Sequence, residues 1–245
     1  MASAAAPKQR QTFELIYIEC IRRGWGNSPI WFRRQITAMA MLTFCTLMRG
    51  AETVSLSRDG IVWVKKGGAV IMDSSFVPEI DQRGELYGSD AEDGGKRFDI
   101  LGLLVCVPSR KNKQHIPSWI PVMDKATLRV LARHVAFLDR SFPEGDPLFI
   151  ARQSKRVKFS PDRAMPVSDF RNQLREALIA CCGLTTQQAK QFGAHSLRIG
   201  VTTHLARRGV SAELRQQLGE WMSRETSLRY LQLAPQAQFE VLSRM

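Results

Sequence analysis

The sequence lacks the features that mark several common classes of protein. Its five cysteines form no Cys-x-x-Cys pair and keep no regular spacing, so we expect reduced thiols in an intracellular protein. The opening residues, MASAAAPKQRQ, contain no apolar stretch of the kind found in a secretory signal. The longest apolar run covers 13 residues, from Ile36 to Met48, which is too short to cross a bilayer and fits a buried helix. We therefore expect no membrane partner.

Signals for small cofactors are also missing. No cluster of carboxylates suggests a Mg²⁺ site, and no glycine-rich loop suggests a bound nucleotide. The chain has no internal repeat and no low-complexity region. We therefore expect neither a metal nor an organic cofactor.

The charge balance is the first positive signal. The chain has 35 Lys and Arg residues against 23 Asp and Glu residues, a net charge of +12, with an isoelectric point near 10.0. Residues 151–245 hold 15 basic and 7 acidic residues, so they carry eight of these twelve excess charges. A basic surface of this size suits a polyanion such as nucleic acid, because contacts to phosphates release counterions. Solubility and attachment to a membrane surface are the alternatives.

The apolar periodicity indicates an α+β protein that is mainly α-helical. Two β-branched runs around KKGG predict a hairpin over 60–73, and further strands over 98–109 and 115–123 flank the basic turn RKNKQ. These strands are expected to form a small antiparallel sheet at one edge, and segment 81–97 a surface loop. Helices are predicted over 12–25 and 28–49, after caps at Asp124 and Ser168, and over 196–208, 211–218 and 223–232.

One combination of residues near the end of the chain points to chemistry. His195 and Arg198, in GAHSLRIG, lie three positions apart, so they share one face of a helix. Ser196 is expected to cap that helix, whose free N–H groups favour an anion. A phosphodiester attacked by a tyrosine is such an anion, because its transition state gains negative charge that arginine forks neutralise well. The alternative is a surface helix with an incidental His and Arg.

AHSLRIG resembles the His-x-x-Arg box of the tyrosine recombinases, the phage-integrase family that includes Xer-type and Cre-like enzymes. In that family Gly-His or Gly-Trp follows the box, and the nucleophilic tyrosine lies nine positions later. Here Tyr230 is nine positions after Trp221 in GEWMSRETSLRY. The family's first arginine lies in Leu-Arg-x-x-Glu-x-x-x-Leu, closely followed by Asp-Ile, and LMRGAETVSLSRDGI is similar. The boxes occur in order over residues 29–235.

The resemblance implies a role for each matching residue. Arg49 and Arg198 would hold the scissile phosphate and neutralise the transition state. His195 would hydrogen-bond that phosphate and assist proton transfer from the nucleophile. Trp221 stands where many members have His, and its indole N–H would donate one hydrogen bond. Tyr230 would form a 3′-phosphotyrosyl link and free a 5′-hydroxyl.

Further residues are assigned from the same resemblance. Glu52 would orient the arginine or the histidine. The family uses a lysine on a β-hairpin as general acid to the leaving 5′-oxygen, and the turn VPSRKNKQHIP offers Lys111 and Lys113. Lys111 is favoured because it lies where the first strand ends, whereas a basic turn that only touches DNA backbone is the alternative. The basic cluster RQSKRVKF, from Arg152 to Phe159, is either a DNA-facing loop or a charged face. With the first interpretation, the expected DNA contacts are Lys113, Arg152, Lys155 and Arg156.

The implied fold is a tyrosine recombinase catalytic domain over residues 29–245, with residues 1–28 as an N-terminal tail and linker helix. Family members usually carry a separate helical DNA-clamping domain before the catalytic one, and 28 residues are too few for it. Glu220 is an unexpected acid beside the expected phosphate pocket.

The implied activity is that of a site-specific recombinase or integrase, from a mobile element, that cuts and rejoins double-stranded DNA without metal or ATP. It would act as a homodimer or tetramer on DNA, in the nucleus of a eukaryote or the cytoplasm or nucleoid of a bacterium. One alternative is a catalytically inactive or domesticated DNA-binding protein on the same scaffold. Another is a type IB topoisomerase, which shares the Arg, Lys and Tyr chemistry.

Overall fold

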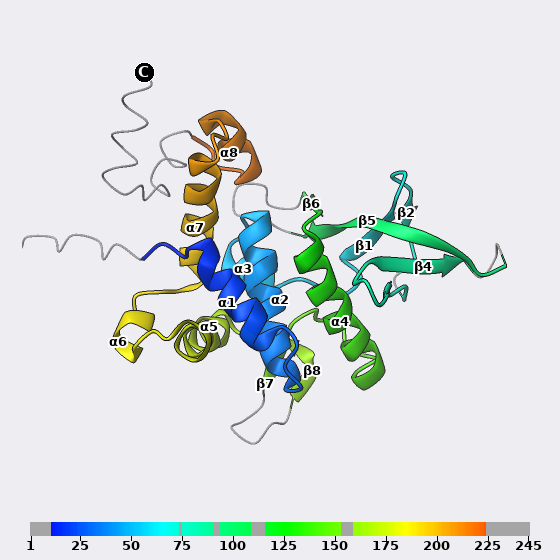
Figure 1. Cartoon of the computed structure of the whole chain (residues 1–245), viewed down its shortest axis with the longest axis horizontal. Coiled ribbons are helices and arrows are strands. Elements are labelled where there is room, and N and C mark those ends of the chain that lie inside the picture. Colours follow the sequence, from blue (N-terminus) through cyan, green and yellow to red (C-terminus); the bar gives the residue numbers. More distant parts are fainter. Residues whose placement is uncertain (1–10, 74, 91–93, 109–115, 153–158, 224–245) are drawn as a thin grey trace, which may run out of the picture.

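The computed structural model describes residues 11–73, 75–90, 94–108, 116–152 and 159–223. A body of helices occupies the left and centre of Figure 1, and a sheet extends from it to the right. The longer helices are α1 (Leu15–Trp25), α2 (Trp31–Thr46), α4 (Lys125–Ser141), α5 (Val167–Cys182) and α7 (Ala194–Arg207). The short ones are α3 (Gly50–Val54), α6 (Thr186–Ala189) and α8 (Ala212–Leu218). The prediction of a mainly helical α+β protein is confirmed.

Helix α2 is the centre of the helical body. Eleven of its 16 residues are buried, because α1, α4, α5 and α7 all pack against it. This explains why its sequence is apolar nearly all round rather than along one stripe. The buried Gln35 ties a strand to this helix: its side chain donates to the carbonyl of Ile150 (3.1 Å) and accepts from the Ile150 N–H (2.9 Å).

The sheet is antiparallel and is built around one long strand. Strand β5 (Lys96–Val107) pairs with β1 (Ile61–Lys65), β4 (Leu86–Asp90) and β6 (Ser118–Val122). The short strands β2 (Val70–Ile71) and β3 (Glu79–Ile80) extend it at the two edges. A separate pair, β7 (Ile150–Arg152) and β8 (Phe159–Ala164), lies next to the helices. Leu103, Val105 and Val107 alternate into the core, which gives the period of two that a half-buried strand requires.

Several predicted boundaries are confirmed. The KKGG hairpin joins β1 to β2, and the Asp124 carboxylate accepts from the Thr127 N–H (2.8 Å) at the start of α4. Ser211 caps α8 by accepting from the Leu214 N–H (3.2 Å). The basic turn at 110–114 and the helix predicted over 223–232 lie almost wholly outside the described residues.

Other boundaries were wrong. The long helix ends at Thr46 rather than Arg49, because Leu47 turns the chain in the left-handed region (φ 55°). Pro166 precedes α5 where Ser168 was expected as the cap, and Gly193 precedes α7, so Ser196 is its third residue. Segment 81–97 is not a loop throughout. Its residues Leu86–Asp90 form β4, which pairs with the start of β5.

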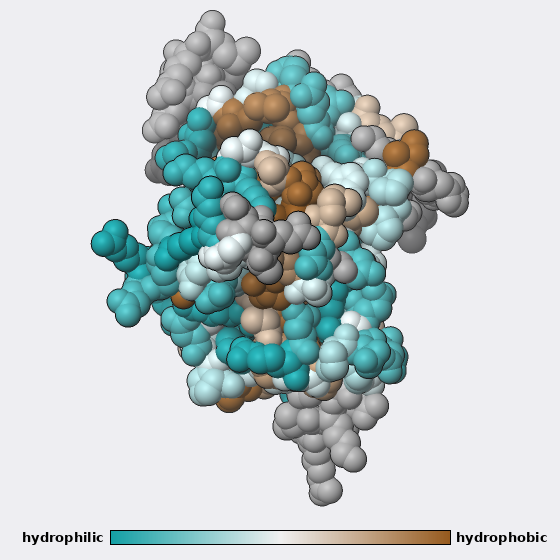
Figure 2. All heavy atoms as spheres, turned by 90° about the vertical axis from the view of Figure 1, so that its right-hand side faces the viewer, coloured by the Kyte–Doolittle hydropathy of each residue, from teal (hydrophilic) through white to brown (hydrophobic). Residues whose placement is uncertain are grey.

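Figure 2 shows the side of the molecule from which the sheet extends. This face is mostly hydrophilic, with separate apolar patches between the polar residues. Exposed apolar residues of β5, β6 and the following turn include Leu101, Trp119 and Met123. Among the described residues, no helix has the length and apolar character needed to span a bilayer.

His134, on α4, is a buried titratable group of the core. Its ring stacks between Trp31 (centroids 6.1 Å apart) and Phe149 (5.4 Å). Nε2 lies 2.8 Å from the Leu148 carbonyl, to which the neutral ring donates. Burial lowers the pKa of His134 from 6.5 to about 4. The fold therefore holds this imidazole neutral.

This burial predicts a pH-dependent stability. The unfolded chain binds a proton at His134 below about pH 6.5, whereas the folded chain does not until about pH 4. The contribution of His134 is therefore complete above pH 6.5 and is lost as the pH falls toward 4. Between pH 7.5 and 5 we expect the free energy of unfolding to drop by about 2 kcal/mol through this group. Urea titrations of the wild-type protein and His134→Gln would measure it. An equal drop in the variant would contradict the assignment.

Candidate active site

Arg49 and Glu52 form the first half of the site, at the junction of α2 and α3. The backbone N–H of Arg49 donates to Glu52 Oε2 (2.7 Å), and its guanidinium Nη1 donates to Oε1 (2.6 Å). Glu52 is buried, while the Arg49 side chain is 23% exposed. One carboxylate therefore caps α3 and also fixes the direction of the arginine beside it.

Arg198, on α7, forms the second half. Its side chain is completely buried, with Nη1 4.0 Å from Glu52 Oε2. Nη2 donates to the Gly219 carbonyl at the end of α8. The guanidinium lies 4.6 Å from the centroid of the Trp221 ring, which is itself buried. The fold thus brings Arg49, Glu52, Arg198 and Trp221 into one cluster, which draws on three separate segments of the chain.

His195 lies one helical turn before Arg198 and is exposed. The predicted spacing of three on one helix is confirmed, but the two side chains differ in access to solvent. His195 and part of Arg49 are exposed, whereas Arg198 and Trp221 are covered. That both arginines contact a phosphate stays a prediction, and only Arg49 is open to solvent in this conformation.

The first residues of α3 and α7 lie very close together, and this contact sets the distance between the Arg49 half and the Arg198 half of the site. A Cβ built on Gly50, the first residue of α3, would lie 2.5 Å from the Cβ of Ala194, the first residue of α7. Real Cβ atoms do not approach this closely, so a glycine is needed at position 50. The sequence contained this residue next to Arg49, but nothing in the pattern indicated why it had to be glycine.

The turn after α8 holds Trp221 against Arg198. A Cβ on Gly219 would lie 2.2 Å from the Trp221 ring, so glycine permits the indole to fold back over it. The backbone N–H of Trp221 donates to the Gln216 carbonyl (3.1 Å). Glu220, between them, adopts a left-handed conformation (φ 47°), which costs a non-glycine residue about 1 kcal/mol. The unexpected acid is thus also in an unusual backbone conformation.

The electrostatics of the cluster favour an anion. Two guanidinium groups share the Glu52 carboxylate. The start of α7 lies beside Arg49, because of the contact between Gly50 and Ala194, and a helix N-terminus adds a partial positive charge. Among the described residues, no group of His, Cys, Asp and Glu is arranged to hold a metal ion.

The remaining predicted site residues are less directly placed. Arg152 ends β7, and its guanidinium lies 5.4 Å from the Phe32 ring in the first turn of α2. Arg49 follows the other end of that 16-residue helix, about 24 Å away at 1.5 Å per residue. The role of Arg152 in DNA binding stays a prediction. Lys111, Lys113, Lys155, Arg156 and Tyr230 lie outside the described residues.

The contact between α3 and α7 yields a prediction. Gly50→Ala would push the two helix starts apart and displace Arg49, and we expect it to lower the free energy of unfolding by about 1 to 3 kcal/mol, as overpacking does. Ala194→Gly in the same chain removes the opposing methyl group and should restore most of the loss. Urea denaturation of the single and double variants tests this. A double variant no more stable than Gly50→Ala would rule out the contact as the cause.

Comparison with models of protein families finds none that matches the chain, and comparison with curated proteins finds no match either. Solved structures do match. The XerH site-specific recombinase bound to palindromic difH substrate aligns with a TM-score of 0.59 and 14% identity, over 99% of this chain and 55% of that one. XerA recombinase gives 0.58 and 14%, over 96% and 65%.

The Tn1549 transposon integrase in complex with transposon right end DNA gives a TM-score of 0.54 and 12% identity, over 99% of this chain and 69% of that one. The chain thus spans between half and about two thirds of the length of these proteins. All three are tyrosine recombinases, and likeness at such low identity concerns the fold. The chain has the fold of tyrosine recombinase catalytic domains.

Proposed function

We propose that the protein is a site-specific DNA recombinase or integrase that cuts and rejoins DNA strands through Tyr230. The observation that carries the proposal is the shared carboxylate of Glu52, which holds Arg49 (2.6 Å) and lies 4.0 Å from Arg198. Two arginines from distant segments are fixed in one place, as a phosphate in a charged transition state requires. The fold and the DNA complexes formed by its structural neighbours agree with this proposal.

The proposed reaction is an exchange of phosphate esters. The Tyr230 oxygen attacks the scissile phosphorus, a bond forms between them, and the bond from phosphorus to the 5′-oxygen breaks. The tyrosine proton leaves with the help of the exposed His195, and the 5′-oxygen takes a proton from Lys111 or Lys113. The reverse attack by a 5′-hydroxyl rejoins the strands. Each step forms one phosphate ester bond as it breaks another, so the energy of the ester bond is kept and the proposed reaction requires neither ATP nor a metal.

The two arginines would act at different stages. Arg49 is partly exposed and is available to a phosphate at the surface. Arg198 is covered, and it holds the Gly219 carbonyl and packs on Trp221. We infer that DNA binding shifts Trp221 or the turn before it, so that Arg198 reaches the phosphate. The pairing of both guanidinium groups with Glu52 would precede DNA binding, and only the cover over Arg198 would have to move.

The rest of the proposal concerns partners and extent. The +12 charge of the chain favours double-stranded DNA as the partner. Strand exchange joins ends from two sites, so at least two copies of the chain would act together. Residues 29–245 would form the catalytic domain, and the chain spans only part of the length of its structural neighbours.

Covalent trapping tests the nucleophile. Wild-type protein and Tyr230→Phe would be mixed, without metal, with a pool of nicked random-sequence duplexes and resolved on denaturing gels. We expect a protein–DNA adduct with the wild-type protein only, because phenylalanine has no oxygen to bond to phosphorus. Sequencing the captured DNA would then give the site. An adduct that persists in the variant would exclude Tyr230. Salt-sensitive binding without any adduct would favour a DNA-binding role on the same scaffold.

Substitution of Arg49 tests the proposed role of the arginines in cleavage more directly than substitution of the buried Arg198. In Arg49→Ala the backbone N–H at position 49 can still donate to Glu52, so the fold should persist. We expect strand cleavage to slow by about 10² to 10³-fold, the usual cost of losing one stabilising group at an oxyanion, with most DNA binding retained. Arg49→Lys keeps the charge without the fork and should lie between. Single-turnover cleavage and DNA-binding titrations measure both. Equal loss of binding and cleavage would contradict the role.

A further inference from the structure

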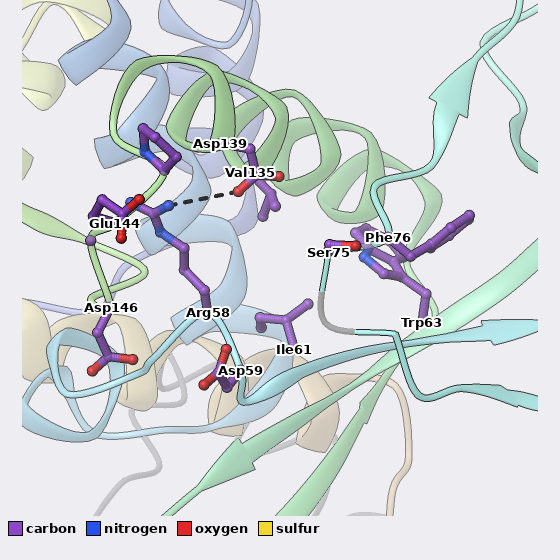
Figure 3. Close-up of a pocket in the computed structure, with 12 residues that line it drawn as sticks. Arg58, Asp59, Ile61, Trp63, Ser75, Phe76, Val135, Asp139, Glu144 and Asp146 are labelled. Atoms are coloured by element: carbon purple, nitrogen blue, oxygen red, sulfur yellow. Dashed lines mark ion pairs between the residues drawn. The ribbon is translucent and has the colours of Figure 1, made fainter.

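A cavity of about 460 Å³ lies between α4, β1 and the turn that follows α4. Figure 1 places α4 and β1 to the right of α7 and α8, which carry part of the candidate active site. Figure 3 shows the cavity with Arg58 on one side and Trp63 and Phe76 on the other. No role in the proposed recombination involves these residues.

One wall of the cavity is acidic. Asp59, Asp139, Glu144 and Asp146 line the cavity together with Arg58, and Figure 3 shows Glu144 and Asp139 on either side of the guanidinium. Asp139 lies 3.7 Å from Arg58 Nη1, and the other three carboxylates form no ion pair with any residue that the structure describes. Four carboxylates against one cation leave the cavity with an excess of three negative charges, in a chain of net charge +12. DNA phosphates are therefore repelled from this cavity, and a cation is attracted.

Arg58 itself lacks hydrogen-bond acceptors. Its side chain is nine-tenths buried, and Nε and Nη2 have no hydrogen-bond partner within the described part of the chain. Burial lowers the pKa of the Arg58 guanidinium, and burial also raises the pKa of the Asp139 carboxyl despite this neighbour. Buried donors without acceptors are costly, so a group that brings an acceptor to Arg58 is favoured.

The opposite wall is apolar. Ile61, Trp63, Phe76 and Val135 line it, and Figure 3 shows the side chains of Ile61 and Val135 below and above the space, with the aromatic residues closing its far end. Trp63 is almost fully buried, whereas Phe76 is half-buried. An occupant thus needs an apolar body as well as a positive charge.

We propose that this cavity binds a basic peptide segment of another protein molecule. The apolar stem of a lysine or arginine, or an apolar side chain next to it, lies on the Trp63 and Phe76 wall. The cationic head pairs with Glu144, Asp146 or Asp139. A backbone carbonyl of the peptide accepts from Arg58, after a small rotation of the guanidinium. The peptide thus matches the three features of the cavity: its charge matches the carboxylates, its apolar part matches the apolar wall, and its carbonyl matches the donors of Arg58.

The test uses a fluorescein-labelled peptide, Gly-Leu-Arg-Gly-Arg-Gly, and its acidic counterpart, Gly-Leu-Glu-Gly-Glu-Gly. Fluorescence anisotropy at physiological salt limits long-range attraction, and the overall positive charge of the protein opposes non-specific binding of the basic peptide. We expect saturable binding of the basic peptide, and no binding of the acidic one that substitutions in the cavity change.

Variants locate the binding. Glu144→Gln with Asp146→Asn should weaken the basic peptide about fivefold or more, since two exposed ion pairs are lost. Phe76→Ala should weaken it too, because the apolar wall is reduced. The matched control, Asp169→Asn with Glu176→Gln on α5, removes the same charge elsewhere and should leave binding unchanged.

Two outcomes would overturn the proposal. One is an absence of saturable binding at millimolar peptide. The other is equal weakening by the control pair, which would mean attraction to acidic surface in general. The result is independent of strand cleavage, so failure here and failure of the recombinase proposal are separate findings.

Discussion

The buried carboxylate of Glu52 is the interaction on which the candidate site depends. It accepts from the backbone and side chain of Arg49 and lies 4.0 Å from Arg198. Without it, two guanidinium groups would be close together in a buried place, which is strongly unfavourable. A single carboxylate thus holds two guanidinium groups from distant segments of the chain.

Packing rather than hydrogen bonding sets the remaining distances. Gly50 allows α3 and α7 to meet, and Gly219 allows the Trp221 ring to turn back over Arg198. Both positions are close to cationic residues of the site, so a methyl group added there would move a charge as well as a backbone. This arrangement also covers Arg198, whose side chain is completely buried.

The charge of the protein is divided between two regions with opposite preferences. The arginine cluster at α3 and α7 attracts anions, whereas the cavity beside α4 and β1 holds four carboxylates around one arginine. The same side-chain type therefore behaves differently in the two places: Arg49 is held by a short ion pair (2.6 Å), and Arg58 by a loose one (3.7 Å). The two proposed binding sites, one for DNA and one for a basic peptide, therefore lie in regions of opposite charge.

The sequence alone determined the helical class, the sheet and the Asp124 and Ser211 caps, because apolar periodicity and cap chemistry are local. The grouping of Arg49, Glu52, Arg198 and Trp221 was expected only from the resemblance of their motifs to a known family. It missed the end of α2 at Thr46, the pairing of β4 with β5 and the true start of α7. Only the tertiary structure decided which residues are covered. His195 and Arg198 lie three positions apart, yet one is exposed and the other fully buried. Burial depends on what α3 and α8 place over α7, and no spacing within one helix contains that information.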